Sequence, residues 1–295
     1  MTLTVEAHGL TKRYGSLRAV NDVSFAIPGG SIVGLLGRNG AGKTTLMQLI
    51  TGQELATSGT VSVFGENPVE NPRAMSTLCF VKEAQKYPED FRVRHVMAVA
   101  PRFFPNWDAA YAEQLVDEFR LSRKQRIKKL SRGQLSSVGI IVGLASRAPV
   151  TIFDEPYLGL DAIARQNFYD HLLADYSENP RTIILSTHLI DEVANLLEHA
   201  IVIDDGRIVL DAPVDELRAS AVTVSGPSGA VEAFTADREV MHHQTLGGLA
   251  TATVAALSER DRAAAASAGL EVGPVSLQQL IIRRSGGWTT EEESA

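Results

Sequence analysis

A glycine-rich segment, residues 37–45 (GRNGAGKTT), carries the residue types needed to hold a chain of phosphates. Gly37 is followed by four residues and then by Gly42, Lys43 and Thr44, which is the spacing of a phosphate-binding loop, or P-loop. Glycine lets the backbone approach the phosphates, Lys43 supplies a cation for the β and γ groups, and the Thr44 hydroxyl is placed for Mg²⁺. The segment therefore predicts a site for nucleotide phosphates and Mg²⁺.

A second group of reactive residues ends the apolar run 150–155 (VTIFDE). At the end of a strand, Asp154 can hold Mg²⁺ through water, and Glu155 can orient a water molecule for attack on phosphorus. Two carboxylates after a strand are often only a solvated turn. Beside a P-loop, we interpret them as a metal ligand and a catalytic carboxylate.

The stretches around the P-loop have the patterns of the elements that must position it. Residues 31–36 (SIVGLL) are short and apolar enough for a buried strand, and Leu46, Leu49 and Ile50 have helical spacing. Backbone amides of the loop and of the helix N-terminus then point at one spot, where the helix dipole favours an anion. The order strand, loop, helix is the one that phosphate binding requires.

The first 217 residues are predicted to form one α/β domain with a mostly parallel sheet, because apolar strand patterns alternate with helical ones. An antiparallel β layer is expected before the P-loop, and a helical subdomain at about residues 88–147. Expected strands are 3–5, 20–27, 32–36, 60–64, 78–81, 150–153, 182–186 and two around 204–206, and expected helices include 162–173 and 189–197.

The composition changes near Pro213, and alanine becomes frequent beyond Leu217. Residues 218–285 are therefore predicted to form a small α+β accessory domain. Within it, residues 221–275 read as strand, helix, strand, strand, helix, strand, which suits a ferredoxin-like fold. A helix at SLQQLIIRR and an acidic tail, residues 286–295, follow, and we expect the tail to be disordered.

Composition narrows the functional classes further. The formal net charge of −7 argues against a general nucleic-acid-binding surface, so no nucleic-acid partner is expected. Cys79 is the only cysteine, which excludes an intrachain disulfide and fits a reducing cytoplasm. The N-terminal residues do not have the pattern of a secretory signal, and no apolar run approaches the roughly 18 residues of a membrane-spanning helix.

Three further motifs complete an ordered set: LSRGQ at 130–134 upstream of VTIFDE, and GLD at 159–161 and STH at 186–188 downstream of it. Together with the P-loop and VTIFDE, they strongly resemble the ATP-binding subunit of ATP-binding-cassette (ABC) transporters, of the bacterial exporter or multidrug type. The resemblance covers residues 3 to about 217. It implies a P-loop NTPase fold of the ABC type, with ATP as ligand and Mg²⁺ as cofactor.

The resemblance also implies roles for individual residues. Tyr14 would stack on adenine with Val20 nearby, Glu155 would be the catalytic carboxylate, and His188 would be the switch histidine that reaches the γ-phosphate. Asp154 and Thr44 would serve the metal, and Asp161 would act across a dimer. The nucleotide would be held by Gly37, Asn39, Gly40, Ala41, Gly42, Lys43, Thr44 and Thr45.

Two motifs depart from the family pattern. LSRGQ resembles the signature LSGGQ, whose Ser131, Gly133 and Gln134 would bind the nucleotide of the opposite subunit, but Arg132 stands where the family usually has glycine. At the family's glutamine loop, an ungapped alignment places Glu83 at the expected position. Gln85, two residues later, has the glutamine side chain that the family pattern requires. Both residues therefore remain candidates for the catalytic contact, and Gln85 is also a candidate metal ligand.

As a function, the resemblance implies ATP hydrolysis that drives a separate integral-membrane permease from the cytoplasmic face, with export of a drug, antibiotic or lipid-like substrate. Two cassettes, as a homodimer or a heterodimer, would close head to tail around ATP. The alternative is a soluble ABC ATPase that acts on ribosomes, DNA or another assembly. The single cassette and the lack of a heptad run in this sequence make that alternative less suitable.

Overall fold

The computed structural model describes residues 3–83 and 85–284. The chain forms two compact units, which we describe separately. The first contains the residues up to Leu189 together with Leu196–Asp211, and the second contains Ile190–Asn195 together with the residues from Ala212 on. The division therefore falls six residues before the boundary expected at Leu217, and a short internal segment belongs to the second unit. The expected tail, residues 286–295, lies outside the described residues.

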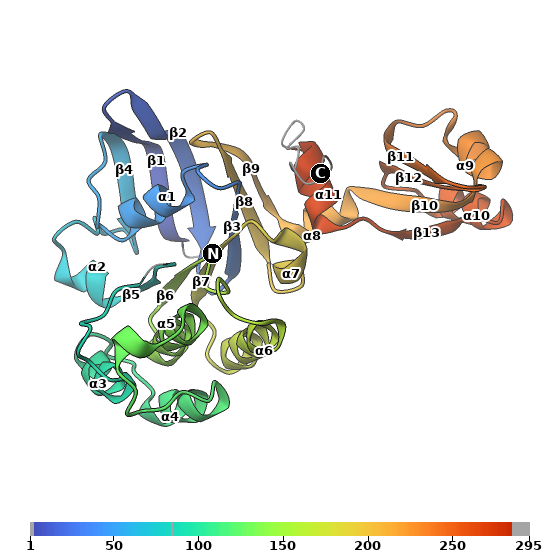
Figure 1. Cartoon of the computed structure of the whole chain (residues 1–295). Helices are drawn as coiled ribbons and strands as arrows, with labels where there is room; N and C mark the ends of the chain where they lie inside the picture. Colours follow the sequence, from blue (N-terminus) through green and yellow to red (C-terminus); the bar gives the residue numbers. More distant parts are fainter. Residues whose placement is uncertain (1–2, 84, 285–295) are drawn as a thin grey trace. The chain divides into compact units, whose positions relative to one another are not determined.

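A six-stranded sheet, in the order β5-β6-β7-β3-β8-β9, runs through the first unit (Figure 1). Its strands are β3 (Ile32–Leu36), β5 (Leu78–Val81), β6 (Val150–Asp154), β7 (Thr182–Thr187), β8 (His199–Asp204) and β9 (Arg207–Pro213). The pairs β5–β6, β6–β7, β7–β3 and β3–β8 are parallel. Every residue of β3, β6 and β7 is buried, which explains their nearly continuous apolar sequences.

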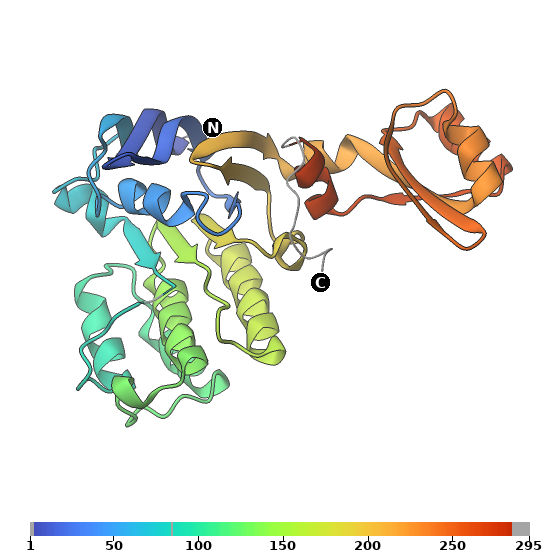
Figure 2. The ribbon, with the colours of Figure 1, turned by 45° about the horizontal axis from the view of Figure 1, so that its top comes forward.

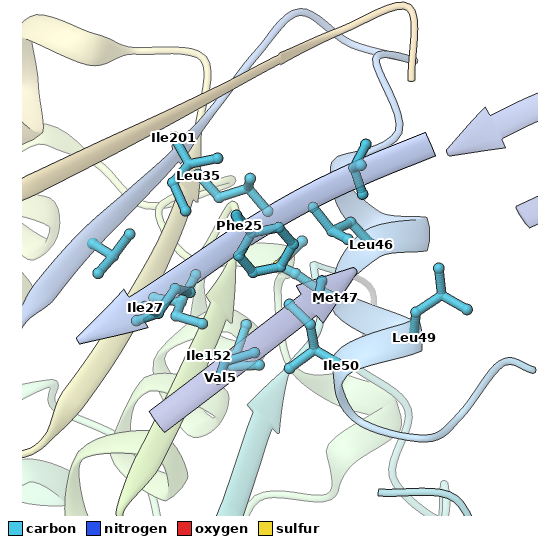
Figure 3. Close-up of a cluster of buried hydrophobic side chains, with 14 of the residues drawn as sticks. Val5, Phe25, Ile27, Leu35, Leu46, Met47, Leu49, Ile50, Ile152 and Ile201 are labelled. Carbon is cyan, nitrogen blue, oxygen red and sulfur yellow. The ribbon is translucent and has the colours of Figure 1, made fainter. Parts of the chain in front are cut away.

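A second, antiparallel sheet of the first unit has the order β2-β1-β4. It consists of β1 (Leu3–Tyr14), β2 (Leu17–Pro28) and β4 (Ser58–Val63), so the two N-terminal strands are longer than expected. Helix α1 (Lys43–Ile50) contributes to the hydrophobic core that joins the two sheets. Figure 3 shows Phe25 of β2 and Met47 of α1 in this core, with Ile152 of β6 nearby. The core holds the helix that begins at the P-loop.

The helical subdomain comprises α3 (Val93–Val99), α4 (Ala109–Glu118), α5 (Arg132–Ser146) and two 3-10 turns, within the expected range. Helix α5 packs against β5 and β6 and lies beside α6 (Ala162–Glu178) (Figures 1 and 2). The close approach needs small residues, since a Cβ at Gly143 would lie only 2.3 Å from Phe153. A short helix, α2 (Pro72–Ser76), precedes β5.

The second unit contains an antiparallel sheet in the order β11-β12-β10-β13. Its elements follow one another as strand, helix, strand, strand, helix, strand: β10 (Ala221–Pro227), α9 (Ser228–Thr235), β11 (Val240–Leu246), β12 (Leu249–Ala255), α10 (Glu259–Ser267) and β13 (Glu271–Pro274). Val222, Val224 and Val254 of the strands and Val231 of α9 form a separate small core.

The described part of this unit also contains three further helices: α7 (Ile190–Val193), α8 (Val214–Ala219) and α11 (Leu277–Arg284). Helix α11 packs against α7 and α8, and the amide of Gln278 donates a hydrogen bond to Asp191 Oδ1 (3.3 Å). The helix expected at 189–197 was wrong in length, because α7 contains only four residues. The apolar positions that suggested a longer helix are divided, with Ile190 and Val193 in this unit and Leu197 in the first.

Candidate functional site

The P-loop connects the end of β3 at Leu36 to the start of α1 at Lys43. Two of its glycines adopt positive φ angles, 83° at Gly40 and 109° at Gly42. Gly42 is the N-cap of α1, and a Cβ there would lie 2.3 Å from the carbonyl oxygen of Ala19. Both the backbone conformation and the space therefore require glycine at position 42.

Lys43 reaches back across the P-loop. Its Nζ donates to the carbonyl oxygens of Gly37 (2.5 Å) and Arg38 (3.1 Å) and lies 3.4 Å from Glu155 Oε1. Burial lowers the pKa of Lys43, and the negative charge of Glu155 opposes this shift. The ammonium group is thus a buried cation at the loop, held by acceptors that phosphate oxygens could replace.

Thr44 and Asp154 meet although 110 positions separate them, because β6 ends beside the first turn of α1. Thr44 Oγ1 donates a 2.9 Å hydrogen bond to Asp154 Oδ2. Burial raises the pKa of the Asp154 carboxyl, and the hydrogen bond from Thr44 opposes the shift. A hydroxyl and a carboxylate are the hard oxygen donors that Mg²⁺ prefers, so these two residues fit a magnesium site.

Glu155 follows β6 directly and has a left-handed backbone, with φ of 47°. Its amide donates to the carbonyl oxygen of Ser186 on β7 (3.2 Å), and its carboxylate lies 3.0 Å from His188 Nδ1. The register of the parallel strands β6 and β7 pairs Asp154 with Ser186, which brings the following residues of both strands together. The structure thus unites the two motifs that carry Glu155 and His188.

Tyr157 is a residue of this site that the sequence analysis missed. It is buried, and its hydroxyl contacts the Glu155 carboxylate, Thr187 Oγ1 (2.8 Å) and His188 Nδ1 (3.2 Å). Burial raises the pKa of the Tyr157 hydroxyl, and its hydrogen bond to Glu155 raises it further. Its place two residues after Glu155 was the only sequence signal that could have identified it.

A cleft of about 600 Å³ lies at this site. The expected site residues that line it are Tyr14, Asn39, Gly40, Gly42, Lys43, Thr44, Thr45, Glu83, Asp154, Glu155 and His188. Additional lining residues are Leu17, Arg18, Ala19, Arg38, Arg132, Leu158, Asp205 and Gly206. An aromatic side chain, Tyr14, therefore lines the same cleft as the Lys43 ammonium group and the carboxylates of Asp154 and Glu155.

Three expected contact residues lie away from the cleft surface. Val20, expected beside the adenine, is fully buried in the core of the first unit, because alternate residues of β2 point into that core. Gly37 and Ala41 support the loop instead: Gly37 accepts from Lys43, and the carbonyl oxygen of Ala41 accepts from the amide of Gly206 (3.0 Å).

The two candidates for the glutamine loop occupy different places. Glu83 lines the cleft and forms a 2.8 Å ion pair with Arg132. Gln85 instead lines a neighbouring cavity of about 240 Å³, which Glu83, Arg132 and Glu155 also border. Arg132, the residue that departs from the signature pattern, thus contacts the glutamine-loop region of its own chain.

The remaining signature residues lie at the start of α5, outside the cleft. Ser131 is the N-cap, and its side chain and that of Gln134 each accept a hydrogen bond from the other's backbone amide (3.2 and 3.1 Å). Gly133 has no room for a side chain, since a Cβ would lie 2.2 Å from the carbonyl oxygen of Gly159. Asp161 caps α6 by accepting from the amide of Ala164 (2.8 Å).

Comparison with known proteins gives consistent matches. Residues 20–158 match the family model described as ABC transporter. The chain is 24% identical to the ABC transporter ATP-binding protein YtrB of Bacillus subtilis, over 75% of each chain. It is 30% identical to the Nod factor export ATP-binding protein I of Burkholderia lata, over 77% of this chain and 78% of the relative. It is 28% identical to the bacitracin transport ATP-binding protein BcrA of Bacillus licheniformis, over 74% and 72%.

Solved structures share the fold of this region. An ATP-binding subunit of an ABC transporter superposes with a TM-score of 0.66 at 24% identity, covering 72% of this chain and 91% of the other. A dimeric ATP-binding cassette in a post-hydrolysis state with ADP and Pi gives a TM-score of 0.64 at 21% identity, covering 71% and 98%. Within residues 3–83 and 85–284, no helix has the length and apolar character to cross a membrane.

Proposed function

This chain belongs to the ABC transporter family, and from that premise we propose that it is the ATP-hydrolysing subunit that powers export through a separate membrane permease. The observation that carries the proposal is the convergence of Lys43, Thr44, Asp154, Glu155 and His188 around one cleft. The relatives named for bacitracin transport and Nod factor export support the transport role. They disfavour the alternative of a soluble ABC ATPase that acts on ribosomes or DNA.

Each side chain of the cleft has a separate role in ATP binding or hydrolysis. Lys43 exchanges its carbonyl acceptors for oxygens of the β- and γ-phosphates, and Tyr14 packs against the adenine. Thr44 and Asp154 would hold Mg²⁺, which when bound neutralises charge on the β- and γ-phosphates. Glu83 takes the glutamine-loop role in this proposal, because Glu83 borders the cleft whereas Gln85 borders the neighbouring cavity.

Glu155 orients water in line with the γ-phosphorus, and His188 contacts the γ-phosphate. The water oxygen bonds to phosphorus as the bond from phosphorus to the β–γ bridging oxygen breaks, and the proton that the water loses passes to the Glu155 carboxylate, which yields ADP and phosphate. Positioning and charge neutralisation lower the barrier, because little covalent chemistry is required of the protein.

A complete site requires a second cassette. Ser131, Gly133 and Gln134 lie at the N-terminus of α5 and do not border the cleft of their own chain. Backbone amides at a helix N-terminus favour an anion, so this end suits the γ-phosphate of a nucleotide bound to another subunit. We infer a head-to-tail homodimer or heterodimer, and the fold of a dimeric cassette supports it.

The partner in the membrane is a permease encoded separately, with the cassettes at its cytoplasmic face. The deciding experiment is affinity purification of the tagged full chain from detergent-solubilised membranes of its own host. We expect a polytopic membrane protein to be recovered with it, and Mg²⁺-dependent ATPase activity in the complex. An untagged strain provides the control. Recovery only with ribosomes, or only as free protein, would favour the soluble ATPase.

A further inference from the structure

We propose that Tyr157 is a positioning residue for ATP hydrolysis: its hydroxyl fixes the Glu155 carboxylate, and with it His188, in the orientation used for turnover. The inference deepens the proposed function and rests on it. Tyr157 lies in the loop that joins β6 to α6, and only 3% of its surface is exposed. Its hydroxyl lies between the two motifs that supply Glu155 and His188.

The hydrogen bonds of this cluster have a consistent direction. An ionised carboxylate only accepts, so the Tyr157 hydroxyl donates its single proton to Glu155. The hydroxyl must then accept from Thr187 Oγ1, 2.8 Å away, and Thr187 Oγ1 itself accepts from the amide of Leu189 (2.9 Å). A chain of donors therefore runs from the backbone after β7 to the catalytic carboxylate.

The Glu155 carboxylate also determines which ring nitrogen of His188 carries a proton. Nδ1 lies 3.0 Å from Glu155 Oε2 and 3.2 Å from the Tyr157 hydroxyl. Because the carboxylate cannot donate, the hydrogen bond requires that Nδ1 carry the proton. The other ring nitrogen, Nε2, takes no part in these two contacts, and the His188 side chain also lines the cleft.

Glu155 needs such a restraint for two reasons. Its backbone has a positive φ, which is unfavourable for a residue with a side chain and persists only where neighbours determine it. Its carboxylate also lies 3.4 Å from Lys43, whose attraction acts on the oxygen opposite the one that contacts Tyr157. Contacts on both oxygens define the plane of the carboxylate, and hence the direction in which it can accept a proton from water.

The test compares the full-length wild type with Tyr157→Phe, which keeps the ring and removes only the hydroxyl. Tyr176→Phe is the matched control, because its hydroxyl donates to the carbonyl oxygen of Gly30 (2.6 Å) and lies 3.2 Å from the Glu198 carboxylate, in a different hydrogen-bonded group from Glu155 and His188. Steady-state ATPase assays give kcat and KM, while ATP titration and thermal unfolding report binding and stability. The same substitution is made in Glu155→Gln and measured in single turnover.

We expect Tyr157→Phe to lower kcat about 10- to 100-fold with KM within about two-fold of wild type, as for a lost hydrogen bond to a charged group. In Glu155→Gln the same change should lower the rate by less than about three-fold, because the two residues act as one unit. Tyr176→Phe should keep the wild-type kcat.

Wild-type kcat in Tyr157→Phe would overturn the inference. The inference would also be overturned if adding Tyr157→Phe to Glu155→Gln lowered the single-turnover rate as much as Tyr157→Phe lowers kcat in the wild type, since Tyr157 would then act independently of Glu155. Loss of ATP binding or of folding together with turnover would equally overturn it, because the hydroxyl would then support the nucleotide site as a whole. Failure of the wild type to hydrolyse ATP would instead refute the proposed function, which keeps the two failures distinct.

Discussion

Substitution of Lys43 by alanine should weaken ATP binding as well as turnover. Lys43 is the buried cation of the P-loop, and its pKa is lowered by burial, so its ammonium group gains from an anionic partner. Among the residues that the structure describes, this group contacts two carbonyl oxygens and one carboxylate. ATP would supply β- and γ-phosphate oxygens in their place.

The size of the effect follows from this exchange of partners. Two hydrogen bonds to charged phosphate oxygens contribute about 3–6 kcal/mol together, at about 1.5–3 kcal/mol each. The bonds to Gly37 and Arg38 that are given up are worth about 1–3 kcal/mol together, at about 0.5–1.5 kcal/mol each. At the midpoints of these two ranges the net loss in Lys43→Ala is about 2.5 kcal/mol, which raises the Kd for ATP about 70-fold.

Titration with a fluorescent ATP analogue, with and without Mg²⁺, measures this Kd directly. Lys124→Ala is the matched control, because Lys124 is an exposed lysine of the helical subdomain that does not line the cleft. It should bind ATP as the wild type does. A wild-type Kd in a folded Lys43→Ala protein would refute the reasoning and would remove the P-loop from the mechanism.

Three other outcomes are expected. Glu155→Gln should bind ATP but hydrolyse it far more slowly than the wild type, and it should double in mass by light scattering when ATP is added; a mass that stays constant would argue against homodimer closure and leave a heterodimer. A chain cut after Leu217 should keep ATP binding, since no assigned site residue follows His188, and a folded truncation without binding would contradict this. Gly143→Ala should lower the free energy of unfolding by about 1–3 kcal/mol in urea, because its methyl group would overlap Phe153, and an unchanged midpoint would contradict that packing.

Much of the first unit follows from local sequence patterns. Strand β5 has the bounds expected from its apolar run, and β3 and α1 flank the P-loop as expected, because each pattern is contained in a few consecutive residues. The family and the class of fold are confirmed by the comparisons. The segment 190–195 was not predictable in this way, because its structure depends on α8 and α11, which are distant in sequence.

The site shows the same division between local and distant information. The sequence by itself was enough to predict one phosphate site with Lys43, Thr44, Asp154, Glu155 and His188, because each belongs to a short motif whose order is informative. The motifs need no knowledge of distances. They indicate the type of chemistry, and all five residues line one cleft in the structure.

Only the tertiary structure decided which other side chains reach that site. Glu83 borders the cleft and Gln85 a neighbouring cavity, although both lie in one loop. Val20 points into the core, and the Tyr157 hydroxyl reaches Glu155 and His188. The physical reason is that such contacts depend on the register of β6 against β7 and on the direction in which each side chain leaves its backbone, which separate short motifs do not specify.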